Sequence, residues 1–107
     1  MKRADKIRAV RRYLVSSTGI PSIYWDGVSS TLDAPLPYAF TVSTDGSAWR
    51  FFESVKQDIP GRLPFTIRYD AHINNVDSSV VGMRLYDFAP LLKAHYEAGD
   101  NHNREGD

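Results

Sequence analysis

Apolar residues at the start of the chain recur at the spacing of an α-helix. Ile7, Val10 and Leu14 are three and four residues apart, so they share one face of a helix that we predict over residues 3–15. Gly19 tolerates a positive φ and is expected to end this helix, and a proline two residues later prevents its resumption. The fold is therefore expected to open with an amphipathic helix.

The middle of the chain changes to the alternating pattern of β-strands. Apolar and smaller or polar residues alternate over residues 38–43, which predicts a half-buried strand. The pair Asp45-Gly46 is typical of a type I′ turn, the turn that joins two strands of a hairpin. We therefore predict a second strand over residues 48–55, paired antiparallel with the first.

Two further segments have strand character. Residues 23–25 form a short apolar run, which is followed by a polar stretch over 26–34 that we interpret as a surface loop. After the Pro60-Gly61 break, alternation resumes over residues 63–72 and predicts another strand.

The last third of the chain allows two interpretations. Residues 79–86 alternate as a strand would, and Asp87 would then cap a helix that carries Pro90 in its first turn. Alternatively, the helix starts near Ser79 and is kinked at the proline. We favour the strand, because proline inside a helix costs about 3 kcal/mol. In both cases Gly99 is expected to end the helix, whose shared face would be formed by Phe88, Leu91, Leu92 and His95.

These elements define an α+β fold. We expect a mainly antiparallel sheet of four to five strands, flanked by an N-terminal and a C-terminal helix. A chain of 107 residues with 42% hydrophobic and 24% charged residues has the composition of one globular domain, assigned to residues 1–99. Residues 100–107 are expected to form a polar tail.

The absence of cysteine and of long apolar runs bears on location. The chain contains no cysteine, which rules out disulfide bonds and fits a reducing compartment. Neither a membrane-spanning segment nor a secretory signal is apparent in the sequence. We therefore expect a cytoplasmic protein that does not contact a membrane.

Charge is balanced overall but unevenly distributed. Thirteen basic and thirteen acidic residues cancel, which argues against nucleic acid as the partner. The first twelve residues are nevertheless strongly basic, and the last eleven are acidic. A basic contact face on the first helix would consist of Arg8, Arg11 and Arg12. A nucleic-acid-binding accessory role is thus the weakest of the functions considered.

The sequence offers little material for catalysis. Asp70 and His72 are two residues apart on a predicted strand and project to one side, as an orienting pair or two metal ligands would. A solvated strand end explains them more simply. The chain contains neither a nucleophile elbow nor a phosphate-binding glycine motif. We therefore expect no enzyme activity, no cofactor and no metal site.

Large apolar residues on both faces of the predicted hairpin indicate contact with another protein. A sheet with one face in water would alternate more cleanly, and aromatic residues and arginine are enriched at the centres of interfaces. Alternatively, the loop over 26–35 and the tail cover the second face. The predicted protein-binding residues are Tyr38, Phe40, Trp49, Arg50, Phe51, Phe52 and Tyr69.

The first part of the chain resembles a known family. The segments IRAVRRYL, TGIPSIYWDG and APLPYAFTVST, within residues 4–44, are similar to the opening of small tail-completion or tail-terminator proteins of tailed bacteriophages. The resemblance implies a sheet with flanking helices, assembly into a ring, and a structural role in the virion. The competing class is a small phage or mobile-element inhibitor, a monomer or dimer that binds a host protein such as a motor ATPase or a defence complex.

Overall fold

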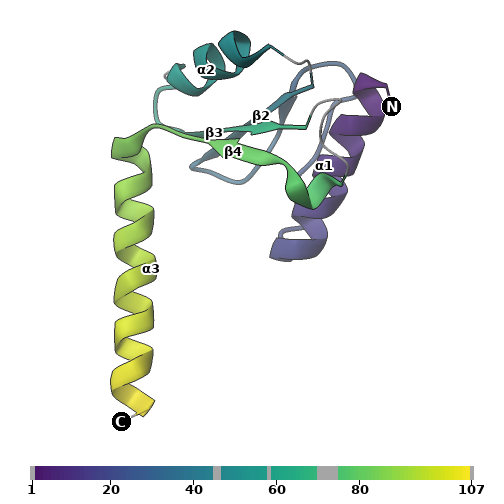
Figure 1. Cartoon of the computed structure of the whole chain (residues 1–107). Coiled ribbons are helices and arrows are strands. Elements are labelled where there is room, and N and C mark those ends of the chain that lie inside the picture. The colour runs from purple at the N-terminus through teal and green to yellow at the C-terminus, as the bar shows by residue number, and fades with distance from the viewer. Residues whose placement is uncertain (1, 45–46, 58, 70–74, 107) are drawn as a thin grey trace.

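The computed structural model describes residues 2–44, 47–57, 59–69 and 75–106. In these residues three α-helices, one 3₁₀ turn and four strands follow one another along the chain (Figure 1). In order they are α1 (Arg3–Thr18), β1 (Thr31–Leu32), β2 (Tyr38–Ser43), α2 (Ala48–Lys56), β3 (Leu63–Arg68), η1 (Val76–Ser78), β4 (Val80–Gly82) and α3 (Leu85–Gly106).

The sheet is mixed, with strand order β1-β2-β3-β4. Its central pair, β2 and β3, is parallel over six residues, from Tyr38 opposite Leu63 to Ser43 opposite Arg68. The two edge strands are short and antiparallel to their neighbours. The expected α+β class and the strand over residues 38–43 are thus confirmed, whereas the prediction of a mainly antiparallel sheet is wrong.

The predicted hairpin is wrong because residues 48–56 form helix α2. The Ser47 hydroxyl accepts a hydrogen bond from the Arg50 backbone N–H at 3.3 Å, which caps the start of the helix. Phe51 and Val55, four residues apart, both face Gly82 of β4. A parallel pair of strands requires a crossover connection, and α2 supplies it. The predicted turn residues Asp45 and Gly46 lie outside the described residues.

Helices α1 and α2 cover opposite faces of the sheet (Figure 1). The face beneath α1 holds the main core, in which Ile7 and Val10 of the helix pack with Val42 and Ile67 of the two central strands. On the other face α2 lies close to β4: a Cβ added to Gly82 would come within 2.6 Å of the nearest α2 atom. The lack of a side chain there allows this close approach.

The opening helix agrees closely with its prediction. It begins at Arg3 and runs to Thr18, one turn beyond the predicted end. Gly19 takes the left-handed conformation, φ 73°, and its N–H donates to the Val15 carbonyl at 3.0 Å. The other predicted strands are shorter than expected. The strand predicted over residues 23–25 is only a bridge between Tyr24 and Asp33. The strand predicted over residues 63–72 spans Leu63–Arg68, and residues 70–72 lie outside the described residues.

The C-terminal region departs most from expectation. The strand interpretation of residues 79–86 is confirmed for Val80–Gly82, but the helix begins at Leu85, ahead of Asp87, and Pro90 lies beyond its first turn. The helix does not end at Gly99, which lacks the positive φ of a helix terminus, and it continues to Gly106. The predicted polar tail is therefore helical as far as Gly106.

Helix α3 does not flank the sheet as predicted. It leaves the end of β4 and extends away from the rest of the molecule (Figure 1), which gives the chain dimensions of 50 × 27 × 26 Å. None of the residues 85–99 is buried. The molecule thus consists of a body, residues 2–84, and an arm, which is α3.

Candidate protein-contact surface

The structure separates the seven predicted protein-binding residues into three locations. Tyr38 and Phe40 lie half-buried on β2. Trp49 and Phe52 lie exposed on the outer side of α2, where Lys56 stands 6.0 Å from the centre of the Trp49 ring. Arg50 is also exposed, but on the side of α2 that lines a hollow with β2. The other two are interior residues. Phe51 is buried on the side of α2 that faces β4, and Tyr69 belongs to the core under α1. Interior side chains do not meet another chain without unfolding, so the prediction fails for Phe51 and Tyr69. For the other five, a contact role stays a prediction.

An aromatic cluster that includes one residue not predicted lies on the α1 side of the sheet. Phe65 of β3 stands beside Phe40 with ring centres 5.4 Å apart, and Tyr38 lies 6.4 Å from Phe40 and 6.1 Å from Phe65. The parallel register brings Phe40 and Phe65 opposite each other. Because the sequence was interpreted as a hairpin, Phe65 had no expected partner on β2.

This cluster forms the floor of an open apolar groove between α1 and β4. The groove encloses about 290 Å³ and is almost free of polar surface. Its walls come from the end of α1 and its following loop on one side and from β4 on the other. The residues that line it most directly are Leu14, Ile20, Tyr38, Phe40, Phe65 and Val81. An apolar groove of this kind on the surface is typical of an interaction site.

The arm carries a second uncovered apolar surface. Leu85, Phe88, Leu92 and Tyr96 follow at intervals of three, four and four residues, so they form one stripe along α3. Their exposed fractions are 79%, 42%, 54% and 69%. The sequence predicted an apolar face on this helix that includes Phe88 and Leu92, but assigned it to the sheet. We call these four residues the arm stripe.

The base of the arm is held by an ion pair. Arg84 Nε donates to Asp87 Oδ2 at 2.7 Å, and both side chains are largely shielded from solvent. The N–H groups of Asp87 and Phe88 donate to the Arg84 carbonyl at 3.1 and 3.0 Å. The Arg84 guanidinium also stacks over the ring of Tyr86 at 4.5 Å. These contacts all lie among residues 84–88 and stabilise the first turn of α3.

The basic residues of α1 hold this helix against the rest of the body. Arg11 Nε donates to the Ile23 carbonyl at 3.0 Å, and Arg8 lies over the ring of Trp25 at 5.2 Å. Buried Lys6 reaches the Thr44 carbonyl, and Arg3 reaches Val28 and Ser30 on the loop after the helix. Of the three predicted contact arginines, Arg8 and Arg12 are exposed and Arg11 is half-buried.

The loop after α1 is organised around one carboxylate. Asp26 Oδ1 accepts the N–H groups of Val28 and Ser29 at 2.8 and 2.9 Å and the Ser29 hydroxyl at 3.2 Å. The two backbone hydrogen bonds favour the charged form and lower the pKa of Asp26 below its ordinary value. Trp25 Nε1 closes the loop by donating to the Ser29 carbonyl at 2.8 Å.

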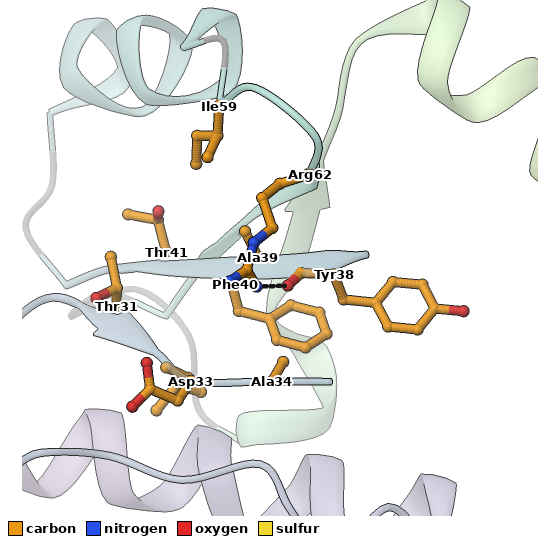
Figure 2. A pocket seen from close by; sticks show the side chains of 10 residues that line it. Thr31, Asp33, Ala34, Tyr38, Ala39, Phe40, Thr41, Ile59 and Arg62 are labelled. Atoms are coloured by element: carbon orange, nitrogen blue, oxygen red, sulfur yellow. Dashed lines mark hydrogen bonds between the residues drawn. The ribbon is translucent and has the colours of Figure 1, made fainter. Parts of the chain in front are cut away.

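A second hollow, of about 230 Å³, lies at the edge of β2 where β1 ends (Figure 2). Arg62 Nη1 donates to the Tyr38 carbonyl at 3.2 Å across its rim, and Asp33 supplies a carboxylate. One carboxylate and one guanidinium provide neither a paired acid and base nor an activated nucleophile. Within the described residues no three His, Cys, Asp or Glu side chains gather as metal ligands would. The predicted pair Asp70 and His72 lies outside those residues.

Comparisons with known proteins return no match, whether with family models, with curated proteins or with solved structures. The resemblance of residues 4–44 to phage tail-completion proteins therefore stays a prediction. No helix in the described part of the chain is long and apolar enough to cross a membrane.

Proposed function

We propose that the protein is a non-catalytic adaptor that acts by binding another protein through the apolar surfaces of its arm and groove. The observation that carries the proposal is the arm stripe: four large apolar side chains lie along a helix that makes no substantial contact with its own body. Leaving such side chains in water costs about 1.5–3 kcal/mol each relative to burying them. A partner that covers the stripe recovers this free energy.

The adaptor class that fits best is the tail-completion type of tailed bacteriophages, which residues 4–44 resemble. Such a protein works as a building block in an assembly. Its requirements are exposed apolar docking surfaces on a rigid domain, and the arm, the groove and the outer face of α2 meet them. The inhibitor class would use the same surfaces on a host protein.

Nucleic acid is a weaker candidate partner. Four of the cations on α1 contact carbonyls, a hydroxyl or an aromatic ring of the body. Residues that hold the fold together are poorly placed to follow a phosphate backbone, which requires a continuous basic track.

A photo-crosslinking amino acid at Leu92 tests the proposal. In a bacterial host that expresses the protein, Leu92 replaced by benzoylphenylalanine is expected to give covalent adducts with protein. The same replacement at Ala94, which lies on the opposite side of α3, is the matched control and is expected to give few. If neither the arm stripe nor a probe at Trp49 gives adducts above the control, the adaptor function is wrong.

A further inference from the structure

We propose that the arm of one copy docks in the apolar groove of a second copy of this chain. The inference rests on the proposed protein-binding function and names the partner of its two main surfaces. The arm stripe and the groove are both apolar, both open, and both part of the same molecule. A second copy therefore brings a matching surface to each of them.

Charge supports this pairing. Before Leu85 the chain has eleven basic and eight acidic residues, and from Leu85 onward it has two basic and five acidic residues. The body thus has a net charge of +3 and the arm with its terminal residue −3. An acidic arm is attracted to a basic body, and two arms or two bodies repel each other.

The structure favours a second copy over the chain's own body as the occupant. An arm of 22 helical residues is about 33 Å long. To reach its own groove, the arm would have to change direction at residues 83–84, where the chain passes from β4 to α3. A second copy can receive the arm in the direction in which it already extends from the rest of the molecule (Figure 1).

The area available reaches the size of a small specific interface. The four side chains of the arm stripe are between 42% and 79% exposed. Aromatic side chains present about 150–250 Å² each, so the stripe offers on the order of 400 Å². Two arms and two receiving grooves would together bury on the order of 1,000 Å², the lower end of the range for specific interfaces. The arm and the groove are different surfaces of the chain. The assembly therefore closes either as a dimer in which each copy docks its arm in the other, or as a ring of more copies.

Engineered cysteines test the docking directly, because the chain has none of its own. One variant carries Leu92→Cys in the arm, and another carries Val81→Cys, an exposed position on the groove wall. After the two are mixed and allowed to exchange, oxidation is expected to join them as a covalent dimer. Ala94→Cys replaces Leu92→Cys in the matched control and is expected to give at least about tenfold less dimer, because it faces away from the groove.

The double variant Val81→Cys with Leu92→Cys distinguishes docking of the arm on a second copy from docking on its own body. A disulfide between chains supports docking on a second copy. A disulfide confined to one chain, or none at all, overturns it. Both products are distinguished by their size on a non-reducing gel.

Light scattering provides the second measurement. The unmodified protein is expected to be a dimer or a larger closed oligomer, and Leu92→Glu is expected to raise its dissociation constant about tenfold or more. Helix content should be unchanged, since Leu92 is an exposed arm residue. A strict monomer at high concentration would overturn the inference. If the Leu92 photo-crosslinker then still captured a different protein, the adaptor function would stand without the second copy.

Discussion

Helices α1 and α3 carry the same apolar spacing but meet opposite surroundings. In α1 the pattern is Ile7, Val10 and Leu14, and in α3 it is Leu85, Phe88 and Leu92, with intervals of three and four residues in both. Ile7 is 0% exposed and Leu85 is 79% exposed. The spacing thus determines that a helix has an apolar face, whereas the connection between the helix and the sheet determines what that face can reach.

The largest expected effect comes from truncating the first residue of each pattern. Ile7→Ala should lower the free energy of unfolding by about 2–5 kcal/mol, because it leaves a cavity in the core. Leu85→Ala should change it by less than about 0.5 kcal/mol, since no body contact is lost. Urea denaturation at low protein concentration measures both. An equal loss for the two variants would mean that the arm packs on its own body.

Two glycines provide the next comparison. Gly82→Ala places a methyl group within 2.6 Å of Val55 and 2.7 Å of Phe51, so overpacking should cost about 1–3 kcal/mol. Gly99→Ala meets nothing within 4 Å and should favour the helix by about 0.5–1 kcal/mol. Urea denaturation reports the first effect, and the helix signal in far-ultraviolet circular dichroism reports the second. A loss of helix signal in Gly99→Ala would contradict a continuous arm.

The two arginines near the middle of α1 should differ in the same way. Arg11→Ala removes the hydrogen bond to the Ile23 carbonyl and should cost about 1–2 kcal/mol of unfolding free energy. Arg12→Ala should change it by less than about 0.5 kcal/mol, because Arg12 is exposed. The denaturation midpoints of the two variants test this difference. Equal midpoints would show that the basic residues do not fasten α1 to the body.

The smallest effect concerns pH and Asp26. Its pKa is lower in the folded protein than in the unfolded chain, where it is about 3.9. The charged form therefore stabilises the fold fully above that value, and the stabilisation is lost as pH falls through the folded pKa. Asp26→Asn should have a lower urea midpoint than the parent at neutral pH and converge with it in acid. A gap between the two midpoints that does not narrow as the pH is lowered into the acid range would contradict this.

The parts of the fold that local patterns determine could be predicted from the sequence. Helix α1 and strand β2 have a clear period and clear ends, such as Gly19 at positive φ. Residues 48–56 fit both periods, because Trp49 and Phe51 alternate while Phe51 and Val55 have helical spacing. The parallel pairing of β2 with β3 joins residues 25 positions apart, from Tyr38 to Leu63, and no local pattern specifies such a pairing.

The candidate site was predictable to the same extent. Tyr38 and Phe40 could be proposed because they stand out on a single strand. Their partner Phe65 depends on the strand order, which the hairpin interpretation had wrong. The apolar face of α3 could be predicted, but its exposure could not, because exposure depends on the direction in which the helix leaves β4.

The brevity of the edge strands has a consequence for solubility. An aromatic sheet surface that is open on one face is a hazard if the sheet edges beside it can also recruit strands from other molecules into fibrils. Here β1 offers two residues and β4 three, against six in each central strand. Backbone pairing therefore has little to extend from, and association is directed to side-chain contacts that can form and dissociate reversibly.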